Sequence, residues 1–385
     1  MNKNRVWLEI DLNQLRLNYR EIKQHVYPAN VLCVLKANAY GLGAPRIARV
    51  LADEGVSGFC VANYAEAEEL LEIGVPVQIL GGVLDYEIEK SISRNIVLGI
   101  VDSPTAYRIS EKAISQNMVA ECHIKIDSGM GRLGIILDRA VDEIRGLISL
   151  PNINFTGLYS HFSMAYKKND ESTLKQVTAF NHVVKVLKEG GINFPKIHIA
   201  NSDANNNYRG LTNVYPFNYV RTGINLLGFV DAESEKVINV EPIIKFKTRL
   251  ISFKRVLKGT SVGYGRTFTL VKDTLIGIIS IGYADGFPLC MSNTGYVIIK
   301  KKKCPIIGRV SMDYTTVSLN GFEESELSIG EEVTCIGSED GNQITVEQWA
   351  KIKGTHPYEI LCSIGDRVER VYNDEKQHET NNTIF

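Results

Sequence analysis

The sequence predicts an α/β protein in which a (β/α)8 TIM-type barrel is followed by a smaller, mostly antiparallel β domain. Three observations predict this fold. The 385 residues exceed the length of a barrel of about 250 residues by enough for one further domain. Eight short apolar runs alternate with segments long enough for a helix, and beyond residue 231 strands and turns dominate. We therefore expect a barrel over residues 1–235, a β-rich domain over 236–372 and a polar tail over 373–385.

The barrel elements begin with a helix, because Leu15, Tyr19, Ile22 and Val26 recur at the spacing of one helical face. Helical segments such as 64–73 and 172–189 separate the apolar runs, and this alternation is typical of a parallel barrel. The eight runs that we expect to form strands span residues 31–36, 58–62, 75–80, 96–101, 121–126, 155–160, 196–200 and 219–224.

The second domain is predicted from short strand-like runs separated by turns, with one helical stretch over 346–352. This texture is typical of antiparallel sheets. The runs include residues 275–281, 296–299, 310–319 and 332–336, and turn-like pieces occur at 292–295 and 340–342.

Composition excludes several classes of protein. Hydrophobic residues make up 44% of the chain, and 43 Lys and Arg balance 44 Asp and Glu, so neither a disordered chain nor a partner of nucleic acid or membrane surfaces is indicated. The seven cysteines are far apart and form no C-x-x-C pair, which favours reduced thiols in a cytoplasmic protein. Glu9 and Asp11 stand where a signal peptide needs its apolar core.

Polar residues follow several predicted strands. Active sites of (β/α)8 barrels lie at the carboxyl ends of the strands, so we expect these residues to share a site. None of them forms a carboxylate and histidine cluster with metal-ligand spacing, and we therefore predict no metal. The residues are Lys36, the loop 127–132, His161, Asn201, Ser202, Arg221, Gly223 and Ile224.

Lys36 has two interpretations. A lysine at a strand end is commonly a surface side chain whose charged tip reaches water. Here the wholly apolar run 31–35 precedes it, which predicts an amine that emerges from the barrel interior. Desolvation there lowers the pKa of an amine and suits it to Schiff-base chemistry. Both interpretations stay open at this level.

The loops after the last two strands are the customary phosphate site of such barrels. Ser202 has small neighbours, and the backbone N–H groups of Gly223 and Ile224 are suited to approach an anion. Alternatively, Asn201 and Ser202 form only a turn and Gly223 is a packing glycine. A lysine together with a phosphate cradle suggests pyridoxal phosphate as the cofactor.

The sequence resembles the alanine racemases, which are barrel-type (fold type III) pyridoxal-phosphate enzymes. The resemblance implies their fold, their cofactor, a homodimer whose sites are shared between subunits, and interconversion of L- and D-alanine for peptidoglycan. It rests on motifs in family order: VLKANAYGLGA (34–44), HIKIDSGMGRLG (123–134), GLYSHF (157–162), HIANSDA (198–204), VRTGINLLG (220–228), SVGYGRTF (261–268), IGYADGFP (281–288), IIGRVSMDYT (306–315) and PYEILCSIGDRVERVY (357–372).

By this resemblance, Lys36 binds the cofactor covalently and acts as one of two bases at the substrate α-carbon. Racemisation needs a second base on the opposite face, and Tyr264 matches it, reaching in from the partner subunit. A tyrosine hydroxyl titrates near 10 when unperturbed, so a cationic neighbourhood must assist it. His161 and Arg221 match residues linked to that tyrosine. Arg221 faces the pyridine nitrogen, where related decarboxylases place a carboxylate.

The remaining roles also come from the resemblance. The cofactor phosphate is expected to meet Tyr40, Ser202, the backbone of Gly223 and Ile224, and Tyr358, with Asn201 beside them. Arg132 and the backbone N–H of the partner's Met312 are expected to bind the substrate carboxylate. Lys125 matches a lysine that is carbamylated in some relatives, and Asp313 and Tyr283 match supporting positions. The alternative is that Tyr40, Tyr264 and Tyr358 are core aromatics.

The chain departs from the family pattern around the site entrance. Tyr166 replaces an acidic residue, the pair Leu289 and Cys290 replaces a basic one, and His356 and Pro357 replace Ile-Asn. Since an apolar pocket rejects larger analogues only weakly, a racemase acting on serine or a longer side chain is the alternative. A non-catalytic pyridoxal-phosphate homeostasis protein is a third reading, which Tyr264 and Met312 oppose, and a purely structural role is the weakest. Further substitutions are Thr222, Asn225, Leu227 and Ser311.

Overall fold

The computed structural model describes residues 4–230 and 235–374. The chain forms two compact units. The barrel unit comprises Gln14–Glu241, and the β unit combines Met1–Asn13 with Pro242–Phe385. The expected barrel plus β-rich architecture is confirmed, although the amino-terminal residues join the β unit and not the barrel. Of the expected polar tail, residues 375–385 lie outside the described residues.

The barrel unit contains all eight predicted strands as two parallel four-stranded paths, β10-β2-β3-β4 and β5-β6-β8-β9. Backbone hydrogen bonds also join the two paths, from Ile79 N–H to Val97 O (2.9 Å) and from Asn218 N–H to Ile197 O (3.1 Å). A short strand, β7 (Ile135–Ile136), adds to β6. The strands are β2 (Asn30–Val34), β3 (Gly58–Val61), β4 (Val77–Ile79), β5 (Leu98–Ile100), β6 (Ala120–Asp127), β8 (Ile153–Tyr159), β9 (Lys196–His198) and β10 (Tyr219–Thr222).

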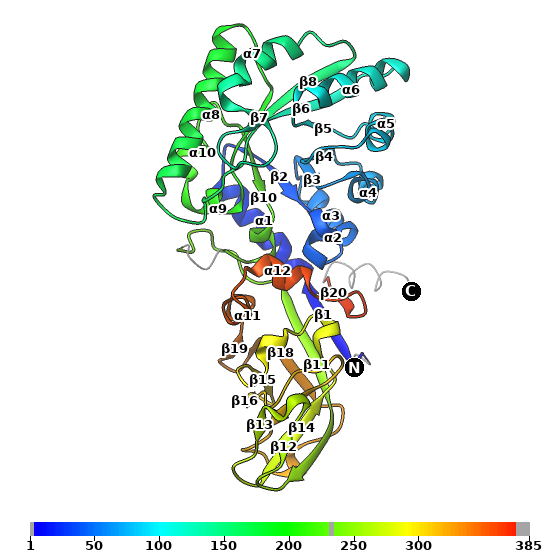
Figure 1. Cartoon of the computed structure of the whole chain (residues 1–385), viewed down its shortest axis with the longest axis vertical. Coiled ribbons are helices and arrows are strands. Elements are labelled where there is room, and N and C mark those ends of the chain that lie inside the picture. The colour runs from blue at the N-terminus through cyan, green and yellow to red at the C-terminus, as the bar shows by residue number, and fades with distance from the viewer. Residues whose placement is uncertain (1–3, 231–234, 375–385) are drawn as a thin grey trace, which may run out of the picture. The chain divides into compact units, whose positions relative to one another are not determined.

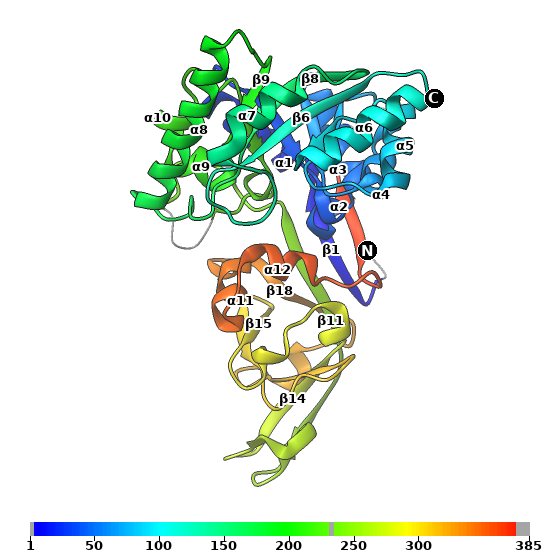
Figure 2. The same cartoon turned by 45° about the horizontal axis from the view of Figure 1, so that its top comes forward.

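Helices flank these strands (Figures 1 and 2). The expected first helix is α1 (Leu12–His25), and its four predicted apolar positions are buried. Throughout the described residues, no helix combines the length and the apolar character needed to cross a membrane. The other helices of this unit are α2 (Lys36–Gly41), α3 (Ala44–Asp53), α4 (Tyr64–Glu68), η1 (Leu71–Ile73), α5 (Asp85–Ser93), α6 (Ser103–Ser115), α7 (Leu137–Leu147), α8 (Glu171–Glu189), α9 (Ser202–Asn207), α10 (Arg209–Thr212) and η2 (Ile224–Leu227).

The β unit is built on a sheet with the order β16-β15-β18-β11-β1-β20, to which β14, β17 and β19 are added. All pairings are antiparallel except that of β1 with β20. Its strands are β1 (Val6–Asp11), β11 (Ile244–Val256), β12 (Ser261–Val262), β13 (Phe268–Thr269), β14 (Thr274–Ile279), β15 (Tyr296–Ile299), β16 (Lys302–Pro305), β17 (Thr315–Ser318), β18 (Glu332–Glu339), β19 (Asn342–Ile344) and β20 (Glu369–Asn373). Its helices are η3 (Tyr264–Arg266), η4 (Tyr283–Asp285), η5 (Leu289–Met291), η6 (Glu324–Glu326), α11 (Val346–Lys353) and α12 (Pro357–Cys362).

The runs predicted for the β unit did not include the long strands β1 and β11, nor the shorter strands β12, β13, β16, β19 and β20. In β1, Leu8 pairs with Phe246 of β11 on one side and with Arg370 of β20 on the other. The buried residues Trp7 and Leu8 are adjacent in sequence. The strand therefore lacks the alternation of apolar and polar residues that identifies a strand with one buried face. In β11, by contrast, Ile244, Phe246, Thr248 and Leu250 are alternately buried, a period-2 signal that was available in the sequence.

Candidate active site

The segment after β2 is wound in the left-handed sense. Ala37, Asn38, Ala39 and Tyr40 have φ between 52° and 57°, a region that costs non-glycine residues about 1–2 kcal/mol each. Ala39 N–H donates to Leu35 O (2.8 Å), and the Asn38 Oδ1 accepts from Ala44 N–H (2.7 Å). Such strain persists only where surrounding contacts hold it and clusters at functional sites. Tyr40, the last residue of this left-handed segment, has a buried side chain.

Lys36 itself is exposed in the single chain, so the desolvation that one of its two interpretations requires is not seen for this side chain. The buried strand ends at Val34, and the left-handed turn begins at once, which carries the lysine side chain out of the apolar run. Lys36 nevertheless lies among other cations, since its charge, with those of Arg221, Lys125 and Arg132, lowers the pKa of His161.

Tyr40, Ser202 and Gly223 come together as predicted. Gly223 N–H donates to Ser202 Oγ (2.9 Å), and a Cβ added at Gly223 would collide with the Tyr40 hydroxyl. Only glycine therefore fits position 223 with Tyr40 in place, although its φ is not left-handed. The neighbouring Ile224 opens η2, and the Asn201 side chain caps α9 by accepting from Ala204 N–H (2.9 Å). The contact between Gly223 and Tyr40 fits both a phosphate cradle and a packing glycine.

Arg221, 2% exposed, is the buried cation of the site. Its Nη2 donates to Ser160 O (2.7 Å), Ile199 O (3.0 Å) and His161 Nδ1 (3.2 Å), and its Nη1 contacts His198 Nδ1. A guanidinium can only donate, so both histidine Nδ1 atoms are acceptors. Burial and then the Arg221 charge lower the pKa values of His161 and His198 well below the usual value. Arg221 is therefore surrounded by neutral acceptors.

A layer of aromatic and imidazole rings beneath Arg221 was missed by sequence reasoning. Tyr159 stacks on His198 at 5.0 Å, Arg221 lies 5.7 Å from the Tyr159 ring, and His198 Nε2 lies 3.5 Å from His123 Nδ1. Burial and then the Lys196 charge lower the pKa of His123 to about 3. These residues come from β6, β8 and β9, and their role is to pack and orient the guanidinium.

The loop after β6 is organised by Asp127, which belongs to the predicted loop 127–132 but had been given no role. Its Oδ1 accepts from the N–H groups of Gly129 (2.9 Å), Met130 (2.8 Å) and Gly131 (3.1 Å), and its Oδ2 accepts from Arg132 N–H (2.9 Å). Burial opposes the ionised form, but these four donors outweigh it and lower the pKa of Asp127. The loop that ends in the exposed Arg132 is thus fixed by one carboxylate.

Lys125 is buried on β6. Its Nζ donates to Leu80 O (3.3 Å) and lies 5.5 Å from the Tyr159 ring. Burial, followed by the charges of Arg221 and Arg132, lowers the pKa of the Lys125 amine to about 8. A substantial neutral fraction at physiological pH makes this amine a nucleophile.

Gln176 of α8 fixes the segment after β8. Its Nε2 donates to His161 O (3.2 Å), and its Oε1 accepts from Ser163 N–H (3.1 Å) and Ser163 Oγ (3.0 Å). The side chain is buried. No sequence signal distinguished this position, because a polar residue within an amphipathic helix is ordinarily a solvated one.

The remaining predicted residues lie in the β unit. Tyr264 is 72% exposed and Met312 52% exposed. Tyr264 stands between Gly263 and Gly265, whose φ values of 70° and 71° present the ring on a tight turn. Tyr283 is also exposed, and Tyr358 is half-buried on α12.

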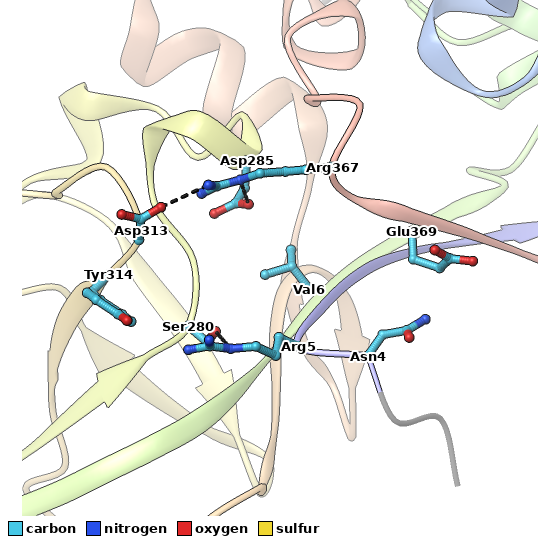
Figure 3. A pocket seen from close by; sticks show the side chains of 9 residues that line it. All are labelled: Asn4, Arg5, Val6, Ser280, Asp285, Asp313, Tyr314, Arg367 and Glu369. Atoms are coloured by element: carbon cyan, nitrogen blue, oxygen red, sulfur yellow. Dashed lines mark hydrogen bonds and ion pairs between the residues drawn. The ribbon is translucent and has the colours of Figure 1, made fainter.

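Arg367 binds two of the turns in the β unit and was not predicted. Its Nε donates to Asp285 Oδ1 (2.6 Å) and its Nη1 to Asp313 Oδ1 (2.8 Å), as Figure 3 shows. Its Nη2 lies 3.4 Å from Met312 O. The predicted supporting residue Asp313 is thus tied to Asp285 through one guanidinium.

Comparisons with known proteins show which sequences and structures the chain resembles. The family model described as the alanine racemase N-terminal domain matches residues 10–231, and that of the C-terminal domain matches 243–372. The chain is 35% identical to the alanine racemase of Clostridium tetani over 373 residues, or 95% of each protein. It is 36% identical to that of Clostridium perfringens strain SM101 over 95% of each.

Solved structures show the same likeness. The alanine racemase of Clostridium difficile 630 superposes with a TM-score of 0.89 at 33% identity, covering 97% of each chain. The alanine racemase of Bartonella henselae, whose structure has covalently bound pyridoxal phosphate, gives a TM-score of 0.85 at 28% identity, covering 96% of this chain and 100% of that one.

Proposed function

The chain belongs to the alanine racemase family, and from this we propose that it interconverts L- and D-alanine with pyridoxal phosphate. One observation carries the proposal. The predicted residues at the ends of β2, β8, β9 and β10 form a glycine cradle, made by Tyr40, Ser202 and Gly223, and a cation held only by neutral acceptors, Arg221. A reaction centre needs both an anion site and a fixed donor.

The cradle fits pyridoxal phosphate. Gly223 has no side chain, so its backbone lies directly against the Tyr40 hydroxyl, and its N–H lies beside the Ser202 hydroxyl. Lys36 would hold the cofactor covalently, and Tyr40, Ser202, Gly223, Ile224 and Tyr358 would bind its phosphate, with Asn201 fixing the start of α9. When bound, the cofactor draws electrons from the amino-acid α-carbon and so makes its proton removable.

Arg221 decides which reaction follows. An arginine stays protonated and donates only, so Arg221 would hold a pyridine nitrogen placed beside it as an acceptor. Neutral partners leave the Arg221 charge intact, and His161 is held as an acceptor beside it. A cofactor ring without a proton on its nitrogen withdraws electrons less strongly, which favours proton exchange at the α-carbon over transamination or decarboxylation.

Two bases are needed because one proton leaves one face of the α-carbon and another arrives at the opposite face. We assign Lys36 to one face and Tyr264 to the other. Arg132 and the backbone N–H of Met312 bind the substrate carboxylate. The exposed Tyr264, Tyr283 and Met312 support a homodimer in which the β unit of one subunit completes the site of the other, since exposed apolar residues commonly mark protein interfaces.

We place the enzyme in the cytoplasm, where it supplies D-alanine for peptidoglycan. Five of the seven cysteines are buried, and their wide spacing without a C-x-x-C pair favours reduced thiols in such a compartment. The homeostasis and structural alternatives leave the β unit, with its exposed Tyr264 turn, without a role.

Serine or a longer amino acid is the second candidate substrate. Tyr166 is half-buried, its hydroxyl lies 3.3 Å from Met164 Sδ, and Asn207 Nδ2 donates to Tyr166 O (3.0 Å). A neutral, fixed tyrosine therefore occupies the position where the family pattern has an acidic residue. Such a lining discriminates side chains by only about 10–200-fold.

The test is a panel of single-enantiomer amino acids offered to the purified protein with pyridoxal phosphate, with chiral chromatography of the products. We expect alanine to racemise fastest, and Lys36→Ala to be inactive. Faster turnover of serine would establish the second candidate. Unchanged racemisation by Tyr264→Phe would remove the two-base assignment, and absence of any racemisation would leave the homeostasis reading.

A further inference from the structure

Two turns of the β unit are joined by backbone hydrogen bonds. Tyr283 N–H donates to Ser311 O (3.0 Å) and Ala284 N–H donates to Met312 O (3.1 Å). A Cβ at Gly282 would collide with the Met312 carbonyl, so the turns are in direct backbone contact. The position of the Met312 peptide is thus set by the turn over 282–285.

These bonds also set the direction of the Met312 N–H. In a trans peptide the C=O and the N–H point in opposite directions, and the peptide between Ser311 and Met312 is not among the cis bonds. Since Ser311 O points at the 282–285 turn, the Met312 N–H points away from it. Within residues 4–230 and 235–374, this N–H has no hydrogen-bond partner.

Arg367 connects these two turns. Asp285 is buried, and its Oδ2 accepts from Gly282 N–H (2.8 Å), closing the first turn, while its Oδ1 accepts from Arg367 (2.6 Å). The same guanidinium reaches Asp313 and Met312 O on the second turn. Without it, the two carboxylates would lie close together with no cation between them and would repel.

We propose that Arg367 is a positioning residue that aims the Met312 N–H at the carboxylate of the amino-acid substrate. The inference rests on the proposed function and adds a residue to it. Arg367 need not touch the substrate. It acts through the Met312 carbonyl and through the two carboxylates that hold the turns.

A lysine cannot replace this arginine fully. The guanidinium spreads donors from Nε, Nη1 and Nη2 over three acceptors on two turns, whereas an ammonium is a point charge on a flexible stem. Arg367 is 46% exposed in its side chain, whereas its partner Asp285 is 5% exposed. Removing the cation leaves a buried carboxylate without its partner, so we expect some loss of stability beside the change in substrate binding.

The experiment compares the holoenzyme with its Arg367→Ala and Arg367→Lys variants in alanine racemisation. We expect KM to rise by about tenfold in Arg367→Ala, with a smaller fall in kcat, because a misaimed N–H weakens one hydrogen bond to a charged group. The KM and kcat of Arg367→Lys should fall between those of the wild type and those of Arg367→Ala. Arg255→Ala removes an exposed ion pair with Glu324 in the same unit and should leave both constants unchanged.

A second readout does not depend on turnover. Hydrogen exchange of the cofactor-loaded protein, followed by mass spectrometry, should show faster exchange over residues 282–286 in Arg367→Ala, by about tenfold, and no change in Arg255→Ala. Should Arg367→Ala not fold, Asp313→Asn removes one of the three contacts and should give the same changes at smaller size.

The outcomes separate the two proposals. An active wild type whose Arg367→Ala variant keeps its KM, or keeps its exchange over 282–286, overturns the role of Arg367 alone. A fall in kcat with an unchanged KM also overturns the role of Arg367. A wild type that racemises no amino acid overturns the proposed function, and the substrate role of Arg367 with it.

Discussion

The Tyr40 hydroxyl occupies the space directly beside the Cα of Gly223, so that no side chain fits at position 223. The two residues come from opposite ends of the barrel sequence and meet because β2 and β10 are paired. Their contact defines the floor of the proposed phosphate site.

Gly223→Ala should therefore weaken cofactor binding. Overpacking of this kind costs about 1–3 kcal/mol, and we expect the dissociation constant of pyridoxal phosphate to rise by about tenfold, measured by absorbance titration. Gly210→Ala is the matched control, because a Cβ at Gly210 meets nothing within 4 Å. Equal affinities in the two variants would contradict the assignment of the cradle.

Lys125 should give the protein a pH-dependent stability. Its pKa is lowered from 10.5 to about 8 by burial first and by neighbouring cations second. Between these values the unfolded chain binds more protons than the folded one, so the free energy of unfolding rises with pH through this window. Well below pH 8 the lysine is charged in both states and its burial penalty is fully present.

Urea unfolding of wild type and Lys125→Met at pH 7.5 and pH 10 measures this effect. The difference between the two proteins removes the titration of tyrosines and cysteines, which is common to both. We expect the free energy of unfolding of the wild type, relative to that of Lys125→Met, to rise from pH 7.5 to pH 10. A constant difference would show that the Lys125 amine is not desolvated.

Asp127→Asn should loosen the loop that carries Arg132. The carboxylate accepts four backbone N–H groups, and an amide at this position accepts fewer. We expect a loss of about 1–3 kcal/mol in the free energy of unfolding and a higher KM for alanine. Because the pKa of Asp127 is lowered by those donors against the effect of burial, its contribution to stability is lost as pH falls through that pKa.

Asp142→Asn is the control for this variant, because its carboxylate is exposed on α7. It should change neither stability nor KM measurably. If both variants behaved alike, the loop would be held by something other than Asp127.

Mixing two inactive variants tests the shared site. Lys36→Ala and Tyr264→Phe each disable every site of their own homodimer. In a symmetric dimer that exchanges subunits, a mixed dimer regains one intact site, and random exchange restores up to about a quarter of the wild-type activity. Racemisation should therefore return on mixing. Continued inactivity, with exchange verified by a tag, would place Lys36 and Tyr264 of one subunit in one site.

The barrel was predictable because strands of a parallel sheet are buried on both faces and so read as continuous apolar runs. Lys36, Ser202 and Arg221 could be picked out because polar residues at the ends of such runs are unusual. β1 was not predictable, since its partners begin at residue 244 and nothing local identifies them.

The roles of Asp127, Gln176 and Arg367 were missed for a shared reason. Each acts by bonding backbone groups or charges of neighbouring segments, and such contacts depend on loop geometry that sequence patterns do not encode. The left-handed turn at Ala37–Tyr40 was missed because only Asn38 among its residues is of a type that adopts this conformation readily. The exposed Lys36 precedes that turn.

The pairing of β1 with β11 and β20 makes the barrel an insertion within the β unit. The sheet of that unit needs residues 6–11 as well as residues that come more than two hundred positions later. A fragment starting at residue 242 would lack a central strand and leave edges exposed to wrong partners. During synthesis β1 must wait unpaired until β11 emerges, while the barrel segment, made in between, is free to fold first. Expression of the β unit alone therefore requires that residues 6–11 be supplied together with the carboxyl-terminal segment.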